Sequence, residues 1–210
     1  FIKSEFDMKD LIRTICQSKT YQLSSIPNEF NAKDKTYFSR YYPKRLNAEV
    51  LYDAINQMTG SQASFSGLPV GTRAVQLPDN SFNSQSYFLT VFGRPDSSSS
   101  CECERSSDAS LAQSLHLLNS KDIQNKLASG SGRAATMAKD AEVKEEDKIR
   151  KLFMLAFSRE PSGSEVLLAR QHLDRVTKDD KGAEKPVDKK LSYEDIIWAL
   201  FNTKEFLFNH

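Results

Sequence analysis

The chain has 210 residues, of which 39% are hydrophobic and 27% are charged, an ordinary composition for a globular protein. Its 29 basic and 28 acidic residues give a formal net charge of +1, which argues against a nucleic-acid binder because such proteins depend on a strongly basic face. The three cysteines are too few for a disulfide-dense scaffold or a zinc-finger array, and no apolar run approaches the roughly 20 residues that span a bilayer.

Two helices are predicted in the first 60 residues. Apolar residues recur at helical spacing from about Phe6 to Gln17. Cys16 falls on the apolar side of that helix, so we expect it to pack in the core as a small hydrophobe. The second helix follows Asn47, the expected N-cap, and ends at Gly60, a residue typical of a helix stop. Because the first residue is Phe1 and not Met, we expect the chain to be part of a larger protein.

Glycine and proline interrupt the chain between residues 61 and 100, where no helical period continues. Short extended pieces fit between them at Ala74–Leu77 and Tyr87–Phe92, the second being rich in residues that favour strands. A structureless connection of about 40 residues would be unusual in a compact domain. We therefore expect an ordered, irregular insert whose aromatic side chains pack on the helices: Phe82, Tyr87, Phe88 and Phe92.

Further helices are predicted downstream. A short one covers 121–127, and the small, polar segment 127–144 follows as a flexible connection that includes a hinge at Ser129–Arg133. An amphipathic helix is expected over 145–159.

The last two predicted helices have recognisable beginnings. Ser162 and Glu165 form a capping box at the start of a helix that runs to about Val176. The polar stretch 177–190 reads as a solvated loop, and Ser192 is the expected cap of the last helix.

The predicted fold is therefore mainly α, a multi-helix domain with a long irregular insert carrying short strands. We expect an N-terminal helical part at 1–126 that includes the insert 61–100, the flexible connection at 127–144, and a C-terminal helical part at 145–210.

The stretch CECERSSDASLAQSLHLLN, residues 101–119, carries the candidate site. Its residues are Cys101, Glu102, Cys103, Glu104, Arg105 and His116. Zinc sites usually leave two or more residues between paired cysteines, so the single residue between Cys101 and Cys103 is an unusual metal spacing. A disulfide between these two would close a very small, strained ring. We favour a charged junction that locks the loop onto the next helix, and keep a metal or redox-active thiol site and a ligand pocket as alternatives.

His116 lies among leucines on a predicted helix that starts near Asp108, at the edge of the core. A hydrogen-bonded structural histidine is the favoured interpretation, and metal ligation is the alternative. The sequence contains no Gly-x-Ser-x-Gly elbow, His-Glu-x-x-His pair, Cys-x-x-Cys-His haem attachment or Gly-x-Gly-x-x-Gly loop. Whether the chain is an enzyme therefore stays open.

Five segments together resemble one family: LIRTICQSKTYQLSS (11–25), RYYPKRLNAEVLYDAI (40–55), FGRPDSSSSCECERSSDASLAQSLHLLNS (92–120), KLFMLAFSREPSGSE (151–165) and IIWALFNTKEFLFNH (196–210). The chain resembles the planctomycete PSD domain, a C-terminal domain of unknown function in large exported proteins. There it follows a planctomycete cytochrome-type domain, often with a c-type haem module further upstream.

The resemblance implies export to the periplasm or cell surface and a missing upstream portion, but it supplies no catalytic residues. No cofactor is expected in this chain, and any haem would belong to the missing module. Export also makes a disulfide that involves Cys16, Cys101 or Cys103 more plausible.

The leading hypothesis is a non-catalytic assembly or binding module of a larger cell-envelope protein. Its expected partners are other domains of the same parent protein or envelope proteins, and neither nucleic acid nor a membrane span is expected. The rivals are a redox or metal-dependent accessory protein or enzyme with its site at Cys101 and Cys103, and a glycan-binding module suggested by the aromatic residues of the insert.

Overall fold

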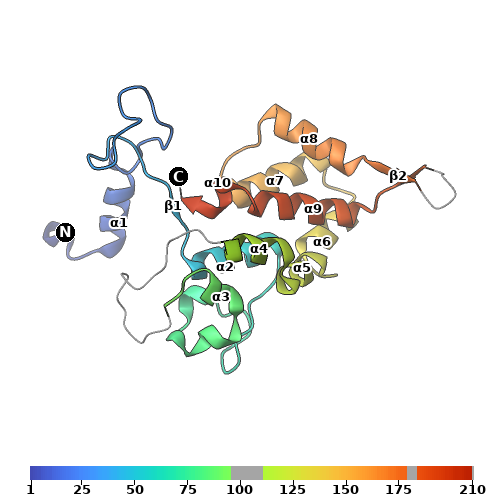
Figure 1. The fold of residues 1–210 in the computed structure, drawn as a ribbon, viewed down its shortest axis with the longest axis horizontal. Helices are drawn as coiled ribbons and strands as arrows, with labels where there is room; N and C mark the ends of the chain where they lie inside the picture. Colours follow the sequence, from blue (N-terminus) through green and yellow to red (C-terminus); the bar gives the residue numbers. More distant parts are fainter. Residues whose placement is uncertain (96–110, 179–183, 210) are drawn as a thin grey trace. The chain divides into compact units, whose positions relative to one another are not determined.

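A computed structural model describes residues 1–95, 111–178 and 184–209 (Figure 1). The fold is mainly α with a few short strands, as the sequence predicts. The chain forms two compact units, an N-terminal unit of residues 1–45 with the last residues from Phe208, and a larger unit of residues 46–207. The predicted helical parts 1–126 and 145–210 both contribute to the larger unit.

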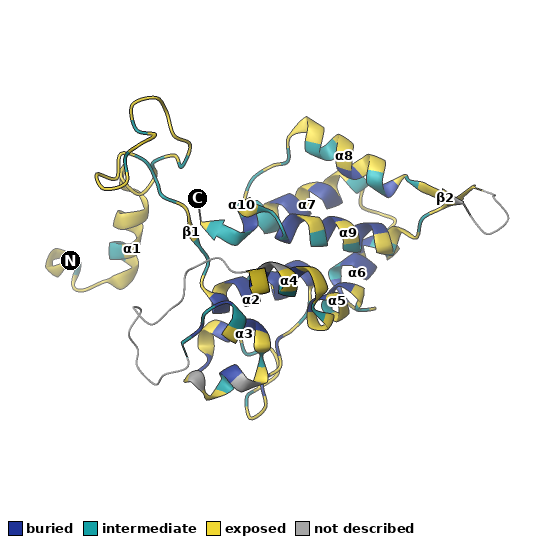
Figure 2. Ribbon diagram, in the orientation of Figure 1, coloured by how far each residue is buried: buried dark blue, intermediate teal, exposed yellow. Residues whose placement is uncertain are grey.

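The N-terminal unit contains the short helix η1 (Ile2–Ser4), helix α1 (Met8–Cys16) and strand β1 (Lys44–Arg45), which pairs antiparallel with β4 (Phe208–Asn209). The Asp7 side chain caps α1 by accepting hydrogen bonds from the backbone N–H groups of Lys9 and Asp10, at 2.8 and 3.3 Å. This confirms the first predicted helix. The expected burial of Cys16 is wrong, because this cysteine is exposed. None of residues 1–45 is buried (Figure 2).

Most helices belong to the larger unit. They are α2 (Ala48–Thr59), α3 (Tyr87–Val91), α4 (Leu111–Asn119), α5 (Lys121–Ala128), α6 (Arg133–Lys139), α7 (Glu145–Phe157), α8 (Gly163–Leu173), α9 (Lys189–Phe201) and α10 (Lys204–Leu207). Helix α9 lies at the centre, since it contacts α2, α5, α6, α7, α8 and α10. Its fully buried residues Tyr193, Ile197 and Phe201 meet buried residues of α2 and α7 in one core (Figure 2).

Local signals set several helix boundaries as predicted. Asn47 occupies the N-cap of α2, and Gly60 ends this helix in the left-handed conformation at φ +70°. A side chain at Gly60 would also meet the backbone nitrogen of Arg133 at 3.1 Å. Ser162 and Glu165 form the predicted capping box of α8. The predicted cap Ser192 is wrong: Asp188 caps α9, and Ser192 is buried inside the helix.

Residues 61–95 of the insert are irregular, as expected, but the predicted extended pieces are wrong. The segment 74–77 forms the short helix η2 (Ala74–Gln76), and 87–92 forms α3. A second short helix, η3 (Asn80–Gln85), lies between them. Helical spacing places Phe88 and Phe92 on one face, where their rings stack with centroids 4.2 Å apart in the core. Tyr87, expected to pack on the helices, is instead exposed.

The segment 127–144, predicted as a flexible connection, contains α6. Ala134, Ala135 and Met137 of this helix are buried, and it packs on α9. Arg133 donates hydrogen bonds to the carbonyl oxygens of Gln57 and Met58 and so satisfies the C-terminal end of α2. Strands β2 (Val176–Lys178) and β3 (Glu184–Pro186) pair antiparallel, so β2 begins at Val176, where the preceding helix was predicted to end, and β3 lies within the predicted solvated loop 177–190.

Candidate functional site

The candidate site predicted from the sequence lies mostly outside the described residues. Cys101, Glu102, Cys103, Glu104 and Arg105 all fall between residues 95 and 111, so the structure does not test their roles. Over the ranges 1–95, 111–178 and 184–209, no three His, Cys, Asp or Glu side chains gather as a metal site would require.

His116 is described, and it packs in an aromatic environment. Its ring meets the rings of Tyr87, Phe88 and Phe92 edge-on, with centroids 5.4, 5.6 and 6.4 Å away. Burial lowers the pKa of His116, which favours the neutral imidazole. Its Nε2 atom has no hydrogen-bond partner in the described part of the chain, so the expected hydrogen-bonded histidine stays a prediction. Its position at the edge of the core is as predicted.

A buried ion pair holds the chain just before residue 96. Arg94 Nε lies 3.2 Å from Glu49 Oε1, and both side chains are at most 10% exposed. The guanidinium also donates to Asn83 Oδ1 and to the carbonyl oxygen of Asp79, at 2.9 Å each. Asn83 Nδ2 in turn donates to the Pro95 carbonyl at 2.8 Å. This network fixes the end of the insert on the start of α2, which is a structural role.

A cavity of about 620 Å³ lies between α2, η2 and the segment after α2; we name it the α2–η2 cavity. Its principal polar lining residues are Asp53, Asn56, Gln57, Gln62 and Arg73. Sequence analysis missed them, because they belong to no motif and the insert brings them together. The sequence did contain one signal for Asn56. It is a polar residue that lies four positions after Tyr52, on the face of α2 that is buried.

A second hollow of about 400 Å³ runs between α7, α8 and α9; we name it the α7–α8–α9 groove. Its lining is mostly apolar, from Phe153, Phe157, Leu168, Ile196 and Leu200. Polar clusters lie at its margins, one around Arg159 and one around His172. The groove therefore has the apolar lining with few polar groups that is common in binding sites.

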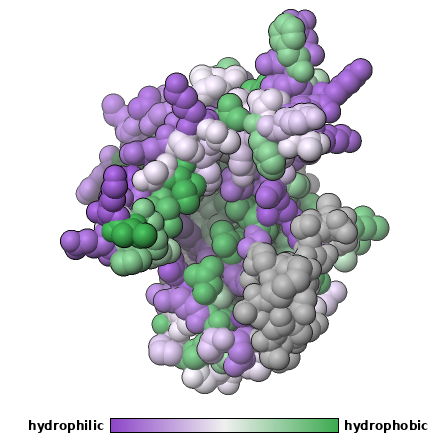
Figure 3. Space-filling model, turned by 90° about the vertical axis from the view of Figure 1, so that its left-hand side faces the viewer, coloured by the Kyte–Doolittle hydropathy of each residue, from purple (hydrophilic) through white to green (hydrophobic). Residues whose placement is uncertain are grey.

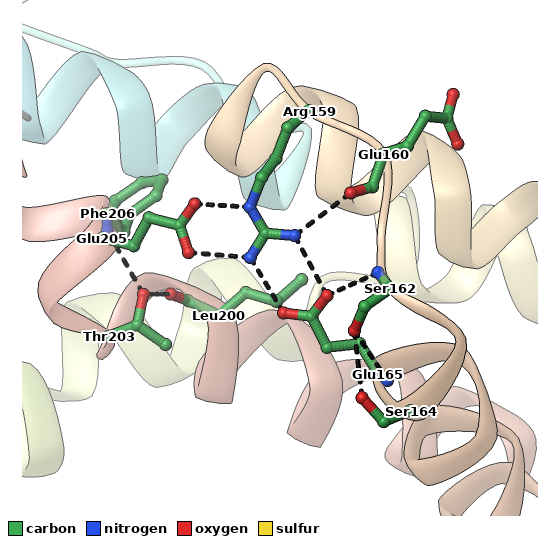
Figure 4. Close-up of polar contacts among 9 residues, drawn as sticks. All are labelled: Arg159, Glu160, Ser162, Ser164, Glu165, Leu200, Thr203, Glu205 and Phe206. Carbon is green, nitrogen blue, oxygen red and sulfur yellow. Dashed lines mark hydrogen bonds and ion pairs between the residues drawn. The ribbon is translucent and has the colours of Figure 1, made fainter. Parts of the chain in front are cut away.

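Arg159 is held between two carboxylates (Figure 4). It donates to both oxygens of Glu205, at 2.6 and 2.8 Å, and to both oxygens of Glu165, at 2.8 and 3.0 Å. The hydrogen bonds that Arg159 donates lower the pKa of Glu165 to about 2, and its hydrogen bonds to both carboxylates raise the pKa of Arg159. The cluster joins the end of α7 to α8 and α10, so its geometry serves the helix packing.

His172 forms the second polar cluster. Its Nε2 lies 3.1 Å from Asp195 Oδ2, which also accepts a hydrogen bond of 2.5 Å from Arg175. The imidazole side chain is 30% exposed. The described groups bonded to this ring are Asp195 and Arg175, so the histidine is paired with charges and not with a hydroxyl or thiol nucleophile.

The N-terminal unit presents apolar side chains to solvent. On α1, Met8, Ile12 and Ile15 lie on one face at spacing i, i+4 and i+7, and they are 58, 56 and 49% exposed. Other large apolar residues of this unit are also exposed, among them Phe1, Ile2, Phe6, Ile26, Phe30 and Phe38. Figure 3 shows one face of the molecule, on which hydrophobic residues are exposed among hydrophilic ones. We name Met8, Ile12 and Ile15 the α1 apolar face.

The described helices include none that is long and apolar enough to cross a membrane. Comparison with curated proteins gives no match, and comparison with solved structures gives none. A family model does match: PSD1, protein of unknown function (DUF1553), over residues 1–173. This range covers residues 1–45 of the N-terminal unit and the larger unit up to the end of α8. The chain therefore belongs to the PSD1 family of proteins of unknown function.

Proposed function

We propose that this chain is a non-catalytic assembly module of a larger, exported cell-envelope protein, and that the α1 apolar face docks on another domain of the same parent protein. The exposed apolar face of α1 carries the proposal. Export and the parent protein are supported by the resemblance of the five sequence segments to domains found in such proteins.

The physical argument starts from the length of α1. Its nine residues, Met8–Cys16, are fewer than the roughly 12 to 15 that an isolated helix needs for marginal stability in water. The Asp7 cap contributes only about 1 kcal/mol. Stable short helices depend on packing of their apolar face, and the described residues of the N-terminal unit, 1–45 and 208–209, include no buried residue to pack against. A docking partner for Met8, Ile12 and Ile15 would supply this missing burial.

The packing of the insert gives the glycan-binding alternative little support. That alternative rested on aromatic side chains available to stack on sugars, but Phe88 and Phe92 are 2 and 3% exposed. Only Tyr87 among the four aromatic residues singled out from the insert is exposed. An apolar docking module needs no such stacking platform.

Site-specific photo-crosslinking in the full-length parent protein tests the proposal. A photoreactive phenylalanine analogue replaces Ile12, in the α1 apolar face, and in a matched control it replaces Arg13, whose side chain is 62% exposed. We expect the Ile12 probe to crosslink to one discrete segment outside residues 1–210 and the Arg13 probe to crosslink weakly. Crosslinks confined to residues 46–207, or equal yields from both probes, would overturn the proposal.

A further inference from the structure

Helix α4 in the larger unit turns a row of leucines away from the core. Leu111, Leu115 and Leu118 follow one another at spacing i, i+4 and i+7, so they lie on one face of the helix. These residues are 75, 47 and 43% exposed, whereas Leu117, on the other side of the helix, is 4% exposed and belongs to the core. Single exposed leucines are common on protein surfaces, but three on one face of a short helix form a patch.

The patch continues from α4 onto α3. The two helices are in contact (Figure 1). The Tyr87 ring at the start of α3 lies 5.4 Å from the ring of His116, measured between centroids, and His116 follows Leu115 in α4. Tyr87 is 68% exposed. We name Tyr87, Leu111, Leu115 and Leu118 the α3–α4 face.

The two stretches of chain that form this face contain no charged residue. Neither 80–93 nor 111–120 has an Asp, Glu, Lys or Arg, although these residue types make up 27% of the chain. Arg94, which follows the first stretch, is buried, and charged side chains resume at Lys121 after the second. The cores of protein interfaces are depleted of charged residues and enriched in tyrosine. The α3–α4 face therefore has the composition of an interface core, although it is exposed.

The absence of charge discriminates between partners. Helices that bind a membrane surface carry Lys and Arg beside their apolar residues, and α4 has neither. A partner with a charged surface would lose solvation of its charges here without gaining an ion pair. In a two-fold contact, a face meets its own copy, so any charge near the axis would meet a charge of the same sign. A charge-free apolar face avoids this repulsion and is complementary to itself.

We propose that the α3–α4 face pairs with the same face of a second copy of this chain, in a symmetric dimer. Leucines at i, i+4 and i+7 match positions d, a and d of a heptad, the seam along which two helices pack. Helix α4 has only nine residues, so this seam is short. Because stable interfaces use roughly 20 to 30 residues a side, we expect a weak dimer with a Kd on the order of 10 to 100 µM.

Sedimentation-velocity ultracentrifugation of the full chain, from about 5 to about 500 µM, tests the dimer. The buffer contains a reductant, because the exposed Cys16 thiols could otherwise join two chains in a disulfide. We expect the weight-average sedimentation coefficient to rise with concentration from the value of a monomer toward that of a dimer.

Three lysine variants locate the contact. Leu115→Lys places a charge at the centre of the α3–α4 face, where the two-fold contact brings like charges together, and should weaken dimerisation by about tenfold or more. Leu168→Lys is the matched control, since it changes a 69% exposed leucine on α8, and it should leave dimerisation unchanged. Ile12→Lys changes the α1 apolar face and should also leave dimerisation unchanged. Thermal unfolding checks that each variant keeps the fold.

Photo-crosslinking supplies a second test that does not depend on the folding of Leu115→Lys. A photoreactive phenylalanine analogue replaces Leu118 in an isotopically labelled chain, which is mixed with unlabelled chain so that mass distinguishes crosslinks between copies. We expect crosslinks between copies to peptides from 80–93 and 111–120.

Four results would overturn the inference. They are a monomer at every concentration, a dimer that withstands Leu115→Lys, a dimer that is lost in Ile12→Lys, and crosslinks between copies that are confined to other segments. The docking proposed for α1 is tested separately by the Ile12 probe in the parent protein, so either proposal can fail without the other.

Discussion

The N-terminal unit and the larger unit place their apolar side chains in opposite ways. Helix α9 of the larger unit is surrounded by helices, and Tyr193, Ile197 and Phe201 are fully buried. Helix α1 has a well-defined apolar face, yet its residues stay exposed. Amphipathic periodicity therefore reports which face a helix can bury, whereas the rest of the fold decides whether that face is covered.

The larger unit has a buried ion pair and the N-terminal unit an exposed one. Breaking one pair in each unit should give the largest difference in the free energy of unfolding. Arg94→Met leaves Glu49 buried without the cation that it contacts at 3.2 Å. We expect a loss of about 3 to 5 kcal/mol in the free energy of unfolding. In the N-terminal unit, Arg13→Met breaks an exposed pair with Asp10, at 3.6 Å, and should cost less than about 1 kcal/mol. Urea unfolding of both variants measures the difference, and similar losses would contradict the structural role assigned to the Arg94 network.

The same truncation in both units separates buried from exposed isoleucines. Ile197→Ala removes a fully buried side chain and should lower the free energy of unfolding by about 2 to 5 kcal/mol. Ile12→Ala should change it by no more than about 0.5 kcal/mol, because the side chain is exposed and alanine favours helix. Denaturant unfolding of the isolated chain is the measurement. A loss above about 1.5 kcal/mol for Ile12→Ala would mean that α1 is already packed within this chain.

How much of the fold could be predicted from the sequence depended on how local the signals are. The capping box at Ser162 and the stop at Gly60 act within one helical turn, so the start of α8 and the end of α2 were predicted correctly. Helix α3 was missed because its aromatic composition favours a strand, although the spacing of Phe88 and Phe92 suits one helix face.

The candidate sites were harder to predict because they join residues distant in sequence. Arg94 and Glu49 are 45 positions apart, and the hydrogen bond from Ala74 to Asp53 spans 21 positions. No spacing rule connects such pairs before the insert is folded. The prediction from local composition, the stretch 101–105, falls outside the described residues, so it stays a prediction.

The Arg159 cluster allows a smaller effect to be measured at the margin of the larger unit. The pKa of Glu165 is lowered from 4.5 to about 2, chiefly by the hydrogen bonds from Arg159. A carboxylate with a lowered folded-state pKa stabilises the protein above its unfolded-state pKa, and this contribution is lost as the pH falls through the folded-state value. Glu165→Gln should therefore cost about 1 kcal/mol at pH 7, and the difference from the unmodified chain should shrink between pH 4.5 and about pH 2.

Glu160 provides the matched control for this pH dependence. Its side chain is 69% exposed and lies 3.8 Å from Arg150, so Glu160→Gln should leave unfolding unchanged at every pH. Chemical denaturation across the pH range makes the comparison. If Glu165→Gln behaved like Glu160→Gln at neutral pH, the cluster would have no role in joining α7, α8 and α10.

Substitution of Cys16 should have the smallest effect on stability. Labelling of its thiol reports whether the end of α1 is exposed. Because this thiol is exposed at the end of α1, a maleimide should label it in the native protein without denaturant. Cys16→Ser removes no buried group, so it should change the free energy of unfolding by less than about 0.5 kcal/mol. Mass spectrometry of tryptic peptides identifies the labelled position. Docking of the α1 apolar face in the parent protein should slow this labelling, since Cys16 lies one residue after Ile15. Equal labelling rates in the isolated chain and in the parent protein would mean that the end of α1 is exposed in both. That result would contradict the docking proposal.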